Sequence, residues 1–196
     1  MRAITVNGQD AGTRAEGLSN MGEVIELLKS MIDPEHMITS ITLDGRELSD
    51  ADWNASTGQF ATSILEIETG LPHEFAHSRL KLAADVVRNC YLSFREARKC
   101  FQEGNMQNGN QNMIGAVNTL QAFFQWYASI IELLPPQERE LFRIDEHVGV
   151  ISDICKRICQ QQLYQSWWAL GETIKSELEP ELDKLEDRCR GIGKRI

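Results

Sequence analysis

Apolar residues recur with two different spacings along this chain, and the change falls near residue 70. In residues 1–70 they alternate with polar residues in short runs, as Ile4 and Val6 do, which is typical of strands with one buried face. In residues 71–196 they recur at steps of three and four, which is typical of helices with one apolar stripe. We therefore predict an α+β protein with one domain at residues 1–70 and a helical domain at residues 71–196.

The first domain carries the turn and cap signals of a small fold of strands around a helix. Asn7-Gly8 favours a tight hairpin after the first strand. Asn20 and Glu23 stand at the spacing of a helix N-cap and its reciprocal partner. An alternating stretch that turns at Asp44-Gly45 and a last strand in "SILEIE" follow. The predicted order is two strands, a helix and two strands.

The second domain contains four apolar seams. An Asn-rich and Gly-rich stretch follows the first seam and Pro135-Pro136 ends the second, so each fits one helix. No breaker separates the third seam from the fourth, where one long or bent helix is the alternative, and Pro180 predicts a kink in the fourth. Short connections between four seams predict an elongated antiparallel four-helix bundle. The seams are Ala76, Leu80, Ala83, Val87, Cys90, Phe94, Ala97 and Phe101; Met113, Val117, Leu120, Phe124, Tyr127, Ile131 and Leu134; Leu141, Ile144, Val148, Ile151, Cys155 and Ile158; and Leu163, Trp167, Leu170, Ile174, Leu178, Leu182, Leu185 and Cys189.

The segment "ITLDGRELSD" combines a strand turn at Gly45, the basic Arg46, the apolar Leu48 two positions on and an acidic stretch with Asp50. In these positions the first domain resembles ubiquitin-like proteins of the β-grasp fold. The resemblance implies a folded adaptor module on which other proteins dock. Because the last strand runs from Thr69-Gly70 straight into a helix, without a free Gly-Gly tail, conjugation to other proteins is not expected.

A second resemblance lies in the helical domain, in "FREARKCFQEGN" followed by "GAVNTLQAF". The pattern is similar to the helical flagellin-export chaperones, in which an amphipathic helix ends in Gly and a polar residue before a second helix with an Ala-rich start. It implies a chaperone-like helical domain, although the Asn-rich loop and the preceding domain depart from that family. The matching residues are Phe94, Ala97, Gly104, Asn105, Ala116 and Leu120.

The second helix of the bundle is apolar beyond its seam. Phe123, Trp126 and Ile130 widen its apolar surface, and Trp168 stands beside Trp167 on the fourth helix. One interpretation is that the first domain or a second copy of the chain covers this surface. The functional interpretation is a docking face for a partner helix or extended segment, with the aromatic side chains as anchors. We predict partner binding at Phe123, Trp126, Ile130 and Trp168.

His73, Glu74 and His77 form H-E-x-x-H, the signature of zinc metalloproteases, in which the histidines bind zinc and the glutamate activates water. The surroundings count against that chemistry. Pro72 places His73 at the start of a helix, and Leu80 stands where the longer form of the motif has Gly. The nearest Glu candidates for a third ligand, Glu96 and Glu103, lie about 28 Å or more from His77 along the same helix. The structural interpretation is a helix start at a domain join, with Glu74 complementing the helix N-terminus.

The net charge of −9 is concentrated in the first domain, because residues 1–70 hold 4 basic and 12 acidic residues whereas residues 71–196 hold 16 and 17. Nucleic acid and anionic membranes both reward clustered positive charge, so neither is an expected partner. No leader pattern and no run of about 18 apolar residues is present, and a cytoplasmic protein is expected.

Five cysteines lie in helical sequence without C-x-x-C spacing, which favours reduced, packed thiols. Cys155 and Cys159 share a helical face with His147 two turns earlier, and a metal site there needs ligands from another helix. No Ser-His-Asp or Cys-His set is recognisable. We predict a non-enzymatic protein-binding adaptor or chaperone-like protein without cofactor, with other proteins or a second copy of itself as partners. The alternative is a zinc-dependent hydrolase using His73, Glu74 and His77.

Overall fold

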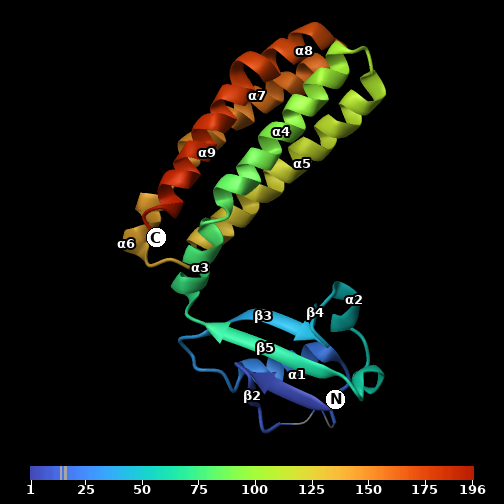
Figure 1. The fold of residues 1–196 in the computed structure, drawn as a ribbon, viewed down its shortest axis with the longest axis vertical. Helices are drawn as coiled ribbons and strands as arrows, with labels where there is room; N and C mark the ends of the chain where they lie inside the picture. Colours follow the sequence, from blue (N-terminus) through green and yellow to red (C-terminus); the bar gives the residue numbers. More distant parts are fainter. Residues whose placement is uncertain (14, 16) are drawn as a thin grey trace. The chain divides into compact units, whose positions relative to one another are not determined.

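The computed structural model describes residues 1–13, 15 and 17–196, and in these residues the fold is α+β. The chain divides into two compact units, Met1–Phe75 and Ala76–Ile196, called here the sheet unit and the helical unit. The sheet unit holds a mixed five-stranded sheet, and the helical unit is built from helices joined by short connections (Figure 1). The predicted α+β class is confirmed at this level.

The strands of the sheet unit pair in the order β2-β1-β5-β3-β4. The central strands β1 and β5 are parallel, and the other neighbours are antiparallel. Since the side chains of a strand alternate between faces, Ile4, Leu65 and Ile67 point to one face and are buried, whereas Glu66 and Glu68 are exposed. The strands are β1 (Ala3–Val6), β2 (Gln9–Asp10), β3 (Met37–Leu43), β4 (Arg46–Glu47) and β5 (Ile64–Gly70).

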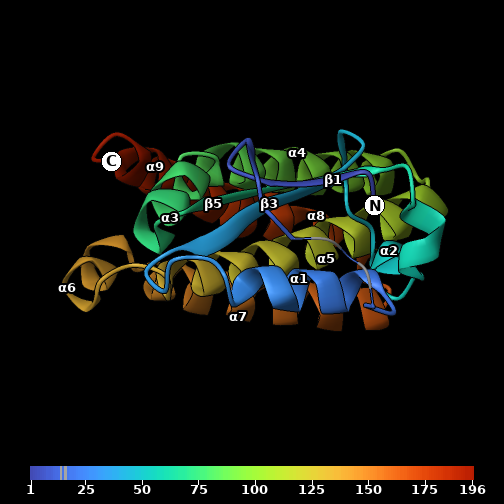
Figure 2. The same ribbon diagram turned by 90° about the horizontal axis from the view of Figure 1, so that it is seen from below.

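Helix α1 (Met21–Lys29) lies across the sheet and completes its core (Figure 2). Its predicted cap is confirmed: Asn20 Oδ1 accepts from the Glu23 N–H at 3.0 Å, and the Glu23 carboxylate accepts from the Ser19 N–H at 2.7 Å. Two short helices, α2 (Asp50–Trp53) and η1 (Thr57–Phe60), connect β4 to β5. The sheet unit therefore buries its apolar strand face under one amphipathic helix.

Arg46, which follows the turn that resembles ubiquitin-like proteins, ties β4 to α2. Its guanidinium donates to both carboxylate oxygens of Asp52, at 2.7 and 2.9 Å, and the Ser49 N–H and hydroxyl also donate to Asp52. The Arg46 hydrogen bonds hold the pKa of Asp52 well below its usual value, and those from Ser49 act in the same direction.

In the helical unit, α4 packs along both α5 and α9, and α7 packs against α8 and α9. All eight residues of the first predicted seam are buried. The approach of α4 to α5 is close at Gly109, because a Cβ there would lie 2.7 Å from the Phe101 ring. The elements are α3 (Pro72–Leu80), α4 (Ala83–Gln102), α5 (Met106–Ile131), α6 (Pro136–Arg139), η2 (Glu140–Phe142), α7 (Asp145–Leu163), α8 (Trp167–Thr173), the π-helical turn η3 (Ile174–Leu178) and α9 (Glu179–Gly193).

The structure corrects the predicted helices at two places. The first predicted helix is interrupted at Lys81 and Leu82, where the Leu82 N–H donates to the Arg79 carbonyl in a turn. The third predicted helix begins later than its seam: α6 and η2 come first, and Leu141 is 56% exposed whereas Phe142 is buried. In both places a short turn interrupts a run of apolar residues that keeps its helical spacing.

The break between the third and fourth helices lies at Gln165. This residue has a φ of 54°, and the Ser166 N–H donates to the Gln161 carbonyl, which is the hydrogen-bond pattern of a left-handed helix C-terminus. Before Pro180, where a kink or restart of the helix was predicted, the helix is interrupted by the π-helical turn η3, in which the Glu179 N–H donates to the Ile174 carbonyl. Pro180 lacks an N–H, so a regular helix cannot continue through it without losing a hydrogen bond.

Candidate docking groove

The residues predicted to bind a partner on α5 are mostly inside the helical unit. Phe123 is 2% exposed and Ile130 is 6% exposed, and the Trp126 ring is partly buried with its centroid 5.9 Å from that of Phe123. Phe123 and Ile130 therefore lie in the core of the helical unit, and their predicted binding of a partner stays a prediction. Trp168, by contrast, is 81% exposed at the start of α8.

Two adjoining hollows, of about 500 and about 400 Å³, lie between α5 and α7. Phe124 lines both hollows, and the two together are called here the α5–α7 groove. Its walls are largely apolar, with Leu120 and Ile151 buried at its floor. The apolar lining residues are Val117, Leu120, Phe124, Tyr127, Ala128, Ile131, Ile144, Val148, Ile151, Cys155 and Cys159.

The groove walls contain residues that the sequence assigned to the second and third seams. Val117, Phe124 and Ile131 on α5, and Val148 and Cys155 on α7, are only partly buried. These residues form two facing rows, one on α5 and one on α7. The two helices are joined near their ends and are separated between them. A sequence reading that closes the bundle on all sides buries these residues, whereas the structure leaves them beside an open channel.

Two hydrogen bonds connect the ends of the two helices. Near one end, the Gln162 side-chain amide donates to Asn110 Oδ1 at 2.9 Å. Near the other, the buried Tyr127 hydroxyl donates to the Phe142 carbonyl at 2.7 Å, three residues before α7 begins. These two hydrogen bonds fix the groove near both ends. The first hollow is lined by α5 and α7, and the second is lined also by α6, η2 and the turns beside them.

The apolar rows continue past the hollows onto exposed surface. Ile114, one turn before Val117 on α5, is 56% exposed. Leu163, one turn after Cys159 on α7, is 81% exposed. Large exposed apolar side chains that prolong an apolar channel are typical of a contact surface rather than of a solvated helix face.

The groove carries little net charge. Helix α5 contains no Asp, Glu, Lys or Arg among its 26 residues. Of the charged residues on the lining, Lys156 binds Asp153 at 2.8 Å, Arg139 binds Glu132 at 2.6 Å, and Arg143 binds both Glu140 and Asp145. A partner in the groove therefore has no uncompensated charge to neutralise.

Cys155, one of the two cysteines of the groove, is a neutral thiol. Burial raises the pKa of Cys155 to about 11, and the neighbouring Cys159 adds to the shift. His147, which the sequence grouped with them, turns away, because its Nδ1 lies 2.8 Å from Glu181 Oε1 on α9. The structure does not bring these three residues together, and Cys155 and Cys159 act as apolar lining.

The H-E-x-x-H stretch lies at the start of α3, with Pro72 as its first residue. His77 Nε2 lies 3.0 Å from Glu138 Oε2 on α6, and its ring meets Phe142 edge-on at 6.1 Å. Glu74 is exposed on the first turn, and His73 is partly buried. Across residues 1–13, 15 and 17–196, no group of three or more His, Cys, Asp and Glu side chains is arranged to hold a metal ion.

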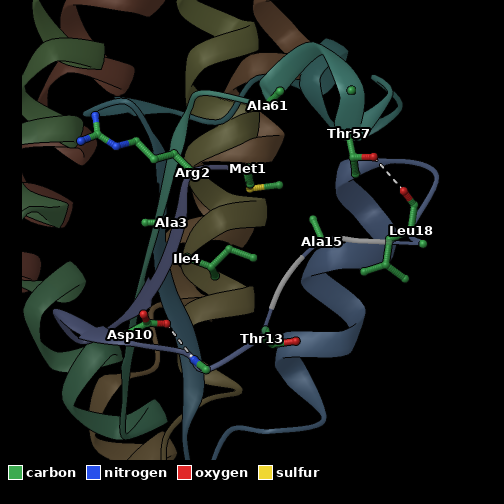
Figure 3. Close-up of a pocket in the computed structure, with 13 residues that line it drawn as sticks. Met1, Arg2, Ala3, Ile4, Asp10, Thr13, Ala15, Leu18, Thr57 and Ala61 are labelled. Carbon is green, nitrogen blue, oxygen red and sulfur yellow. Dashed lines mark hydrogen bonds between the residues drawn. The ribbon is translucent and has the colours of Figure 1, made fainter.

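A larger hollow, of about 760 Å³, lies in the sheet unit beside β1 (Figure 3). Among the described residues that line this hollow, the acidic one is Asp10. Its carboxylate already accepts a hydrogen bond from the Gly12 N–H at 2.9 Å. The Thr57 hydroxyl donates to the Leu18 carbonyl at 2.7 Å, and Arg2 points away from the hollow (Figure 3). Ligand sites usually have several polar groups that converge on one point, which the described lining does not provide.

The sequence contained one signal for the groove that the spacing of its apolar residues did not reveal, namely a long segment without charged residues. Residues 104–131 contain no Asp, Glu, Lys or Arg in a chain with 25% charged residues. A helix with one face exposed to water normally carries charged residues on that face. An uncharged helix therefore indicates that this face packs against another protein surface.

No helix in the described part of the chain combines the length and apolar character that crossing a membrane requires. In comparisons with protein families, curated proteins and solved structures, no match to this chain was found.

Proposed function

We propose that this protein is a non-enzymatic adaptor that binds an apolar helix of a partner in the α5–α7 groove. The observation that carries the proposal is the open apolar channel itself, with paired charges at its rim and exposed Ile114 and Leu163 beyond its hollows. Burying apolar side chains is the dominant favourable term in most protein association. A helix that fills a groove through residues at i, i+3 or i+4 and i+7 is a common recognition mode.

The sheet unit is proposed to be a ubiquitin-like β-grasp module. The strand order β2-β1-β5-β3-β4, the parallel pair β1 and β5, and α1 packed over one sheet face support that proposal. The exposed sheet face carries Glu66 and Glu68, and the acidic charge of this unit favours partners whose surface is neutral or basic. The unit then contributes partner choice, while the groove contributes contact area.

The helical unit is proposed to be an antiparallel four-helix bundle of α4, α5, α7 and α9 that is open on the side between α5 and α7. Contacts of α4 with α5 and α9, and of α7 with α9, support this arrangement. The residues that resemble flagellin-export chaperones fit a chaperone-like use of such a bundle. Phe94 and Ala97 on α4 and Ala116 and Leu120 on α5 are buried, these two helices pack together, and Leu120 also lines the groove.

A display selection tests the proposal. A library of random helical peptides is selected against the intact protein, and enriched peptides are measured against Phe124→Glu, which places a carboxylate on the groove wall. We expect enriched peptides with apolar residues at helical spacing and few charges between them, and a loss of affinity of at least about tenfold for Phe124→Glu.

Ser93→Glu, on the exposed side of α4, is the matched control and should bind the selected peptides as the unchanged protein does. Enriched peptides that bind Phe124→Glu as well as the unchanged protein would place the contact elsewhere and remove the groove from the proposal.

A further inference from the structure

We infer that the helix which fills the α5–α7 groove is α5 of a second copy of this chain, in a two-fold dimer. The inference rests on the proposed function, because it names the partner of the same groove. In this dimer the helices α5 and α7 of one copy pack face to face with α5 and α7 of the other. Each α5 then lies over the channel of the opposite copy.

Charge selects this occupant. Each copy carries a net charge of −9, so most faces of two copies repel one another. Helix α5 is the exception, since its 26 residues bear no charge, and the rim charges of the groove are already paired within the chain. A heterologous partner for an acidic protein is normally steered and selected by complementary charge, whereas homodimer interfaces are more apolar. The uncharged α5 meets a groove whose charged lining residues are paired with one another or with residues beside them.

The available area is that of a stable interface. At about 1.5 Å per residue, the 26 residues of α5 span about 39 Å. Two helices side by side are about 20 Å wide, so the α5–α7 face offers about 800 Å² on each copy. Specific interfaces bury about 800 Å² per partner, so this face is large enough.

Side-chain size along the contact also suits close packing of helices. The exposed face of α5 beside the groove carries Gln121, Ala122, Gln125 and Ala128, which are short or neutral, and the exposed Ile114 stands at its end. A dimer covers Ile114 and Leu163, the exposed apolar residues that extend the two walls of the groove. The channel is incomplete as a binding site in one copy, and α5 of the second copy completes it.

Sedimentation of the intact chain tests the inference. The unchanged protein should be a dimer over about 1 to 200 µM. Its dissociation constant should not rise between about 0.05 and 0.5 M NaCl, because salt screens the repulsion between two acidic copies and the rim charges are already paired within each chain. Gln121→Glu adds one carboxylate to each of two facing groove linings without a change of shape, and it should weaken the dimer at least about tenfold. Gln59→Glu, on an exposed residue of the sheet unit, is the control with the same change of charge and should leave the dimer intact.

Circular dichroism spectra of both variants should match that of the unchanged protein, which checks that they are folded. A dimer that tolerates Gln121→Glu, or a chain that stays monomeric over the whole range, would overturn the inference.

Binding of the apolar dye ANS separates that failure from a failure of the proposed function. If the unchanged protein is a monomer that binds the dye and Phe124→Glu abolishes this binding, the groove is accessible. That result excludes the second copy as its occupant but leaves the proposed function standing. If the protein is a monomer and Phe124→Glu does not change its dye binding, both the dimer and the proposed function are refuted.

Discussion

Phe123 and Phe124 are neighbours in sequence with opposite roles, and their truncation to alanine gives opposite results. Phe123 is 2% exposed and its ring lies 5.7 Å from that of Tyr127 in the packed interior. Truncation of a fully buried Phe leaves a cavity and costs about 3 to 5 kcal/mol of the free energy of unfolding. Phe124 is only partly buried on the groove wall, so its truncation removes less buried area and costs about 1 kcal/mol.

Urea unfolding followed by far-ultraviolet circular dichroism measures this difference, since the helical unit dominates that signal. The unfolding is best recorded at low protein concentration, where association does not add to the apparent stability. We expect Phe123→Ala to be the less stable variant by at least about 2 kcal/mol, and Phe124→Ala to lose association instead. If Phe124→Ala is as destabilised as Phe123→Ala, Phe124 is a core residue and the groove does not exist in solution.

Three further results are expected from single residues. Tyr127→Phe removes the buried hydrogen bond to the Phe142 carbonyl and should lower the free energy of unfolding by about 1 kcal/mol, measured by urea denaturation. Gln165→Gly removes the strain of a left-handed residue and should raise the melting temperature, equivalent to roughly 0.5 to 1 kcal/mol. The pKa of Asp52 is lowered by Arg46, so the stabilisation it provides is complete above the unfolded pKa of about 3.9 and is lost as the pH falls below it. Melting temperatures at pH 3 to 6, followed by near-ultraviolet circular dichroism, should fall less steeply in Asp52→Asn than in the unchanged protein.

Local signals in the sequence predicted much of the fold. The apolar spacing from Ala76 to Phe101 placed eight buried residues correctly, and the six of them on α4 are buried because that helix packs against α5, α8 and α9. The cap at Asn20 and Glu23 was also predicted, since both partners of a cap lie within one turn of each other.

The orientation of α5 could not be predicted in the same way. Its sequence has two overlapping apolar stripes, one through Val117, Phe124 and Ile131 and one through Phe123 and Ile130. Periodicity shows that both are apolar, but the position of the neighbouring helices decides which is buried, and that is information from distant parts of the chain. The predicted contact residues Phe123 and Ile130 belong to the stripe that the structure buries. The residues that line the groove belong to the other stripe, which is only partly buried.

The end of α7 was hidden for a different reason. A helix that stops in a left-handed residue usually has Gly there, whereas this chain has Gln165. Without a Gly or Pro in "CQQQLYQ", no residue type marked the stop, and the hydrogen bond from Ser166 to Gln161 became visible only in the structure.

A photo-crosslinking amino acid at Gln121 tests the groove most directly, in a mixture of ¹⁵N-labelled and unlabelled chains analysed by mass spectrometry. We expect crosslinked peptides that join one labelled and one unlabelled chain and come from α5 or from residues 151–160 of α7, which line the groove. Crosslinks confined to a single chain, or joining the probe to segments outside α5 and α7, would contradict docking of a second copy in the α5–α7 groove.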